Sequence, residues 1–138
     1  MITMKSASRR KFLATTATLA AGTAAMSMPI NTKADKYPVI HHVFFWLKNP
    51  SSKADRDKLV AGVKSLGKIK VVKEIHVGVV ASTEKRDVVD NSWSVSELMR
   101  FSDVAGQKAY QDDPIHLKFI EECSPLWDKV IVYDAVEA

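Results

Sequence analysis

The sequence predicts an α+β fold, a ferredoxin-like βαββαβ subunit with an antiparallel sheet. Segments rich in β-branched and aromatic residues alternate in this order with segments of helical period. The first strand is apolar on both faces, and the second helical region is interrupted at Asp113-Pro114. Because helices cover only one face of such a sheet, we expect the other face to pack on a second copy. Two sheets packed in this way form a dimeric α/β barrel with the helices outside.

Residues 37–48, YPVIHHVFFWLK, form the first expected strand, which is bounded by Pro38 and by Asn49-Pro50. A strand with one wet face should alternate apolar and polar side chains, and this one does not. One face carries His41, Val43, Phe45 and Leu47, and the other carries His42, Phe44 and Trp46. Both faces are therefore expected to be covered.

A helix is expected next, from a cap at Ser51 or Ser52 to Gly67, because apolar residues recur at helical spacing between them. Residues 69–80 alternate as a second strand, and residues 81–91 form a charged connection. Residues 92–101 are expected to form the third strand. One of its faces carries Trp93, Val95, Glu97, Met99 and Phe101.

Two short helices and a closing strand complete the pattern. The first helix has a cap at Ser102 or Asp103. The second is capped by Asp113, has Pro114 in the favoured first position, and ends before Pro125. Residues 127–137 form the last strand, with Val130, Val132 and Asp134 opposite Ile131, Tyr133 and Ala135.

The N-terminal segment predicts an export signal. A basic head ends in the stretch SRRKFL, which resembles the twin-arginine signal of bacteria, and residues 12–28 carry no charge. An ordinary Sec signal is the alternative. Ala and Thr dominate the run, so a permanent membrane anchor is not expected. We place cleavage after Ala34, with an earlier cut near Ala24 or Ala25 as the alternative. Residues 1–34 are then a signal peptide and residues 35–138 one domain.

Removal of the leader changes the charge balance. The chain has 20 Lys and Arg and 16 Asp and Glu, and five of the basic residues but none of the acidic ones precede Asp35. The domain then carries 15 basic and 16 acidic residues, a net charge of −1. No basic surface remains that would favour nucleic acid or an anionic membrane.

The sequence contains no motif for a bound cofactor or metal. Cys123 is the only cysteine, so an internal disulfide cannot form. His41 and His42 are adjacent on a strand and point to opposite faces, so they cannot bind one metal together. No phosphate-binding glycine loop and no cluster with metal-ligand spacing is present. We expect a protein without cofactor or metal.

Three segments, IHHVFFWLK, AYQDDPIHLKFIEE and WDKVIVYD, resemble the stress-responsive dimeric α/β-barrel (Dabb) family over residues 39–136. The most specific part is Tyr110, a short polar stretch and Pro114-x-His116. The resemblance implies a homodimeric barrel of ferredoxin-like subunits. Most members of the family have no defined activity, and some are linked to stress responses in plants.

One member of that family, olivetolic acid cyclase, closes a ring in a linear polyketide by an aldol-type reaction without cofactor or metal. Its catalytic Tyr and His are similar in position to Tyr110 and His116, and a His of its first strand is similar to His41. The resemblance implies a catalytic pair, Tyr110 and His116. This sequence differs at Asp113 and Val95, where the cyclase has histidines, one of which lines its pocket.

The residues themselves are consistent with this chemistry. His116 lies in the first turn of a helix, where the helix dipole favours a neutral imidazole that can accept a proton. A nearby Tyr hydroxyl can stabilise an enolate oxygen. We expect substrate-binding residues at His41, Phe45, Trp93 and Val95. The alternative is structural, with Tyr110 in the core and His116 filling a groove and donating to a backbone carbonyl.

Two functions therefore remain open from the sequence. The first is a small-molecule binding protein or a cofactor-free lyase, cyclase or isomerase that uses the His116 and Tyr110 pair. It has an apolar pocket in each subunit, whose polar end holds Tyr110, His116 and His41. The second is a non-catalytic dimeric stress-response module whose barrel core is filled by side chains. A haem-handling relative on the same scaffold has support from fold analogy alone.

The leader can be tested in a bacterial host. Replacing Arg9 and Arg10 together by Lys should leave uncleaved precursor in the cytoplasm, because the twin-arginine route requires the arginine pair. Cell fractionation and immunoblotting measure the outcome. Export that continues unchanged would identify a Sec signal instead.

Overall fold

The computed structural model describes residues 36–138, so the expected signal peptide lies outside the described residues. The order of strands and helices is the one that the sequence predicts, with the second helical region split in two. Two short 3₁₀ turns, η1 and η2, connect elements. The bounds are β1 (Val39–Leu47), α3 (Lys53–Ser65), η1 (Leu66–Lys68), β2 (Glu74–Gly78), β3 (Val95–Phe101), α4 (Val104–Asp112), α5 (Pro114–Cys123), η2 (Ser124–Leu126) and β4 (Trp127–Val136).

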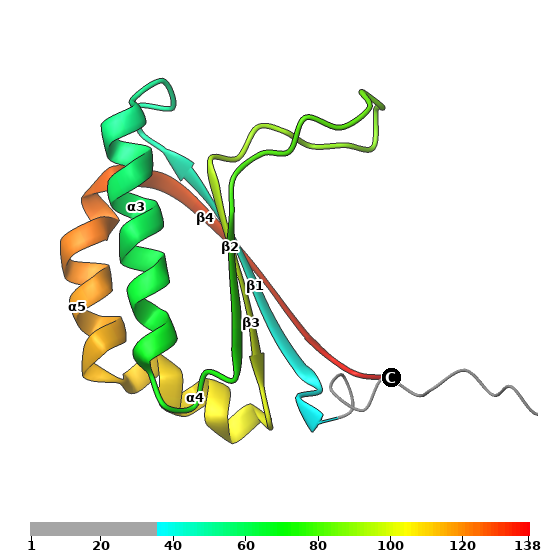
Figure 1. The fold of residues 1–138 in the computed structure, drawn as a ribbon, viewed down its shortest axis with the longest axis vertical. Helices are drawn as coiled ribbons and strands as arrows, with labels where there is room; N and C mark the ends of the chain where they lie inside the picture. The colour runs from blue at the N-terminus through cyan, green and yellow to red at the C-terminus, as the bar shows by residue number, and fades with distance from the viewer. Residues whose placement is uncertain (1–35) are drawn as a thin grey trace, which may run out of the picture. The chain divides into compact units, whose positions relative to one another are not determined.

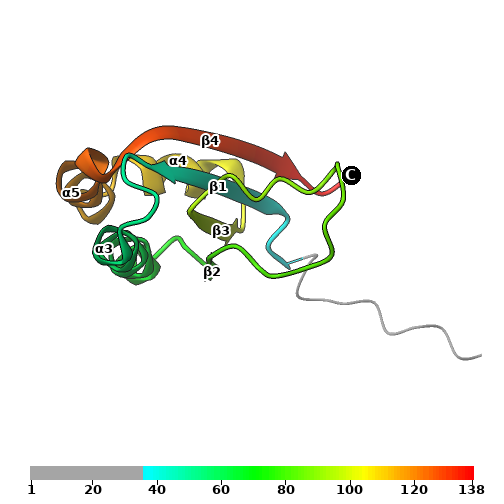
Figure 2. The same ribbon diagram turned by 90° about the horizontal axis from the view of Figure 1, so that it is seen from above.

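The four strands form one antiparallel sheet in the order β2-β3-β1-β4. This is the strand order of a ferredoxin-like subunit, and the fold prediction is confirmed. Strand β1 is central and β4 forms one edge. Helices α3, α4 and α5 lie on one side of the sheet, and the other side is left open (Figure 1). The view from above shows the same layering (Figure 2).

The helices end and begin where side chains can cap them. Ser52 accepts a hydrogen bond from the Asp55 N–H at the start of α3, and Asp103 accepts one from the Gly106 N–H at the start of α4. Asp113 accepts the Ile115 N–H at the start of α5. Each cap satisfies an N–H group that has no partner inside its helix. None of the helices among residues 36–138 combines the length and apolar character that crossing a bilayer requires.

Two strands are shorter than the sequence pattern predicts. The expected strand of residues 69–80 is reduced to β2, because η1 is followed by a turn in which the Val72 N–H donates to the Ile69 carbonyl. The expected strand of residues 92–101 begins at Val95. The connection between these strands is therefore longer than expected and extends on the open side of the sheet (Figure 1).

The two faces of β1 have different environments. Val39, His41, Val43, Phe45 and Leu47 are buried beneath the helices. Ile40, His42, Phe44 and Trp46 lie on the open face and are half-buried in the single subunit. The His41 face therefore does not line the space between two sheets. A pocket that contains His41 has to lie between the sheet and the helices of one subunit.

Close packing of α3 on α5 positions the wall of that space. A Cβ atom at Gly62 would lie 2.6 Å from the Cys123 Sγ and 3.2 Å from the Phe119 ring. A side chain at this position would push the two helices apart. Glycine therefore lets α5 approach α3 closely, and Phe119 packs edge-on against Phe45, with ring centroids 6.3 Å apart.

We expect the open face to bury a second copy of the chain, and Phe44 tests this. Its ring packs on His42 and Trp93, on the open face. Phe44→Asp should give a folded monomer, because a charged group on that face opposes burial against another sheet. Sedimentation at micromolar protein should give twice the subunit mass for the unmodified protein.

Phe45→Asp is the matched control, because Phe45 lies one residue away but is buried beneath the helices. It should unfold the protein rather than separate two copies. An unmodified protein that sediments as a clean monomer and binds no dye for exposed apolar surface would contradict the expectation of a dimer.

Candidate functional site

A cavity of about 160 Å³ lies between the sheet and helices α4 and α5. It opens beside edge strand β4, where Val130 and Val132 are exposed. Its walls are mainly apolar, and its polar groups gather at one end. The lining residues are His41, Val43, Phe45, Glu97, Tyr110, Gln111, His116, Phe119, Ile120, Trp127, Val130 and Val132.

The polar end is built around a buried hydrogen bond between Tyr110 and Glu97. The Tyr110 hydroxyl, in the last turn of α4, donates to Glu97 Oε1 on β3 over 3.0 Å. Each of the two side chains is about 1% exposed. Burial raises the pKa of Glu97 to about 7, although the hydrogen bond from Tyr110 opposes the shift. Burial also raises the pKa of Tyr110, and the neighbouring Glu97 carboxylate raises it further.

His41 continues this set of polar side chains toward the edge strand β4. The register of β1 with β4 places His41 directly opposite Asp134, and the two side chains approach to 2.6 Å between Nδ1 and Oδ1. On its other side, His41 Nε2 lies 3.9 Å from Glu97 Oε1. His41 is buried, whereas the Asp134 side chain is 56% exposed. A chain of polar groups thus connects the buried Tyr110 hydroxyl with solvent.

His116 approaches from the helix side. Its Nδ1 lies 3.0 Å from the backbone carbonyl oxygen of Gln111. A carbonyl oxygen only accepts, so Nδ1 carries the proton, and in the neutral ring Nε2 keeps a free lone pair. Burial lowers the pKa of His116, the carbonyl of Gln111 opposes this, and His41 lowers the pKa further. The neutral imidazole expected from the helix dipole is therefore favoured mainly by burial.

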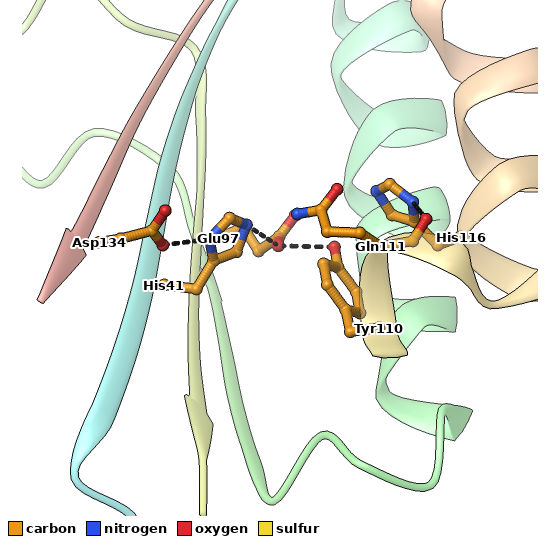
Figure 3. Close-up of polar contacts among 6 residues, drawn as sticks. All are labelled: His41, Glu97, Tyr110, Gln111, His116 and Asp134. Carbon is orange, nitrogen blue, oxygen red and sulfur yellow. Dashed lines mark hydrogen bonds and ion pairs between the residues drawn. The ribbon is translucent and has the colours of Figure 1, made fainter. Parts of the chain in front are cut away.

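The break between α4 and α5 brings His116 back to Tyr110. The Asp113 N–H donates to the Tyr110 carbonyl, and Asp113 then caps α5. After this turn the two rings lie 4.6 Å apart, centroid to centroid. Figure 3 shows the strand residues His41 and Glu97 and the helix residues facing each other, with the Gln111 side chain extended toward the sheet.

Four of the six site residues that the sequence suggests line this cavity: His41, Phe45, Tyr110 and His116. Trp93 does not, because it lies on the open face, packs edge-on against Phe44 and donates its indole N–H to the Asp90 carbonyl. Val95 does not line the cavity either. It is fully buried in the core opposite Phe45 in the neighbouring strand.

Glu97, Gln111 and Asp134 also belong to the site, although the sequence alone did not predict them. A signal was present for the two acids, because each is a carboxylate on a strand face otherwise occupied by apolar residues. Gln111 had no such signal. Among residues 36–138 no group of three His, Cys, Asp or Glu side chains is arranged to hold a metal ion.

The buried carboxyl group of Glu97 predicts a pH-dependent stability. Because its pKa rises from 4.5 to about 7, folded protein keeps a proton that unfolded protein loses. Its contribution to stability is therefore complete below about pH 4.5 and is lost as pH rises through about 7. At roughly 1.4 kcal/mol per pKa unit, the loss is on the order of 3 kcal/mol.

Glu97→Gln removes this titration. The melting temperature of the unmodified protein should fall more between about pH 5 and about pH 8 than that of Glu97→Gln. Calorimetry measures both, with Glu121→Gln on the exposed side of α5 as the control. Parallel pH profiles for the unmodified protein and Glu97→Gln would show that Glu97 is ionised throughout this range.

Comparisons with known proteins agree with this architecture. A Dabb protein of ferredoxin-like fold from Mesorhizobium loti is 25% identical, with a TM-score of 0.60 over 74% of this chain and 98% of its own. The hydroxynitrile lyase of Passiflora edulis is 24% identical, with a TM-score of 0.61 over 75% and 95%. A dimeric ferredoxin-like protein from Thermobifida fusca is 14% identical, with a TM-score of 0.60 over 72% and 91%.

No curated protein matches the chain in sequence. The family model for the stress responsive A/B barrel domain, Dabb, matches residues 39–137. This match covers nearly the whole of the described domain and confirms the resemblance of its three motif segments. The chain therefore belongs to the stress responsive A/B barrel (Dabb) family.

Proposed function

We propose that this protein is an exported homodimer that binds a small, largely apolar carbonyl compound in the cavity of each subunit. There it makes or breaks the carbon–carbon bond at the carbonyl carbon, as a cofactor-free lyase or cyclase. One observation carries the proposal. A neutral His116 keeps its Nε2 lone pair free beside the Tyr110 ring, in a cavity with mainly apolar walls.

His116 has the properties of a general base. The Gln111 carbonyl holds the Nδ1 proton and so determines the tautomer. Because burial lowers its pKa, the ring is neutral near pH 7 and available to take a proton through Nε2. The imidazolium that forms can return the proton to a product atom in the same cavity. Tyr110 supplies a hydroxyl at the adjacent position, where charge develops on the substrate oxygen.

A lyase reaction on a hydroxynitrile illustrates the balance of atoms. His116 takes the hydroxyl proton, the bond from carbon to the nitrile group breaks, and the electrons of the O–H bond form the carbonyl. The leaving cyanide then takes the proton from His116 and departs as hydrogen cyanide. An aldol-type ring closure uses the same groups, with the proton taken from carbon. The likeness to a hydroxynitrile lyase supports this class of reaction for the present chain.

The dimer and the export route have separate support. The open sheet face carries Phe44, Trp46 and Tyr133, and the neighbour from Thermobifida fusca is described as dimeric. Export to the periplasm or the medium is supported by the SRRKFL stretch and the uncharged run that follows it. After cleavage no stable membrane anchor is expected.

The alternative is a non-catalytic dimeric stress-response module. The buried Tyr110 and Glu97 satisfy each other, as structural groups in a core do. The open cavity argues against this alternative, because a filled core would leave no space beside His116. Variants of His116 distinguish the two functions.

Purified protein should release benzaldehyde from mandelonitrile, an aromatic hydroxynitrile, and His116→Ala should abolish this release. The melting temperature of His116→Ala should stay within a few degrees, because a side chain beside a cavity contributes little to packing. Tyr110→Phe keeps the ring but removes the hydroxyl, and should lower turnover by roughly 100-fold or more. Glu121→Gln, on the exposed side of α5 and outside the cavity lining, is the control for an unrelated substitution.

A structural His116 would give the opposite pattern. Its loss would remove a hydrogen bond and lower stability by about 1–3 kcal/mol. A large fall in melting temperature, with no benzaldehyde release by the unmodified protein, would favour the non-catalytic module.

A further inference from the structure

The Tyr110 hydroxyl has a single proton, and this limits what the site can bind. In the structure that proton is directed to Glu97 Oε1, 3.0 Å away. While Glu97 is ionised, it accepts this proton, and the Tyr110 oxygen offers a ligand only lone pairs. A substrate carbonyl oxygen, which needs a donor, then finds none at Tyr110. The contact that the proposed reaction requires is absent in this state.

A protonated Glu97 reverses the direction of the hydrogen bond. Its carboxyl group then has an O–H that can donate to the Tyr110 oxygen. The Tyr110 proton becomes free to turn toward the cavity, which Tyr110, Gln111 and His116 all line. One proton on Glu97 therefore determines whether Tyr110 acts as donor or acceptor for the ligand. Both side chains are almost fully buried, and each is the hydrogen-bond partner of the other in the structure.

Two polar side chains, His41 and Asp134, lie on the side of Glu97 that faces the sheet edge. His41 Nε2 is 3.9 Å from Glu97 Oε1, and His41 Nδ1 is 2.6 Å from the carboxylate of Asp134. The Asp134 side chain is 56% exposed. The side chains of His41 and Asp134 therefore lie between Glu97 and solvent, and the 3.9 Å between His41 and Glu97 is longer than a hydrogen bond.

The other groups described around Glu97 do not stabilise its ionised carboxylate. The titratable ones are Tyr110 from α4 and His41 from β1, with Asp134 beyond His41 and His116 beyond Tyr110. The cavity-lining residues described above include no lysine or arginine. In the flanking strands Glu97 pairs with the apolar residues Val43 and Val77, and the uncharged Gln111 side chain extends toward it from α4 (Figure 3).

We propose that Glu97 is a positioning residue whose protonation turns the Tyr110 hydroxyl toward the ligand, so that the cavity binds uncharged carbonyl compounds when Glu97 is protonated and weakly when it is ionised. The proposal rests on the proposed function for the identity of the binding cavity. The absence of lysine and arginine from the lining excludes carboxylate ligands, because their charge would be buried beside Glu97 without a counterion. Burial raises the pKa of Glu97 to about 7, which places the change in the neutral range.

Binding of acetophenone, an uncharged aromatic ketone, tests the proposal by calorimetry or NMR. The unmodified protein should bind it about three- to tenfold more weakly at about pH 8 than at about pH 6, because one hydrogen bond to the carbonyl is lost. Glu97→Leu removes the acceptor that competes for the Tyr110 proton, and its binding should be tight and independent of pH. Tyr110→Phe should bind weakly at both values. Benzoate, of similar size but charged, should not bind.

A second measurement needs no ligand. The carboxyl carbon of Glu97 and the ring carbon of Tyr110 that bears oxygen should titrate by NMR with one common midpoint. Replacing His41 by Gln should leave that coupling in place, because the hydrogen bond between Tyr110 and Glu97 does not involve His41. Acetophenone binding that is absent at pH 6, or equal at pH 6 and pH 8, overturns the proposal. A Tyr110 signal that does not follow Glu97 also overturns it.

These outcomes are separate from those for the proposed reaction, since neither measurement requires turnover. Absence of mandelonitrile cleavage together with pH-dependent acetophenone binding would reject the reaction and leave the role of Glu97 intact. Normal turnover with pH-independent binding would reject the role of Glu97 alone.

Discussion

The register of β1 between its two neighbours is the constraint on which the site depends. Antiparallel pairing places His41 opposite Asp134 on one side and Val43 opposite Glu97 on the other. A shift of one residue would turn His41 to the open face and bring Ile40 or His42 under the helices. The polar group around His41 therefore exists only in this register. The apolar residues of β1 that pack beneath the helices hold it there.

In this register the carboxyl group of Glu97 is buried, and its burial lowers the stability of the fold. A carboxyl group that is almost fully buried loses its hydration, and one hydrogen bond from Tyr110 offsets only part of that loss. An apolar residue would pack on this face with less penalty, as Val95 and Met99 do on either side. Such local conflicts between stability and chemistry occur at functional sites, where a perturbed pKa is useful.

On the helix side of the cavity, the break between α4 and α5 brings Tyr110 and His116 together. In one continuous helix, residues six apart lie on different faces, so Tyr110 and His116 would not meet. The Asp113-Pro114 turn ends one helix and begins the next, and both rings then reach the same cavity. Asp113 contributes through its backbone and its capping oxygen, which explains why an acid stands at this position whatever the chemistry of the site.

The amino-acid sequence by itself determined the order of the elements, the ferredoxin-like class and the cap at Asp113. For the other two helices it left two candidate caps each, and the structure shows Ser52 and Asp103. The periodicity of apolar residues, the capping residues and the β-branched runs are local properties, so the sequence alone shows them. It also selected Tyr110, His116 and His41, partly through family motifs. Tertiary structure alone decided which face of β1 lies under the helices, since both faces of this strand are apolar. The partnership of Glu97 with Tyr110 and of His41 with Asp134 depends on strand register and helix docking, which join residues 13 and 93 positions apart. Trp93 and Val95 were plausible pocket residues on an apolar strand. Helix docking and strand register instead leave Trp93 on the open face and bury Val95 in the core.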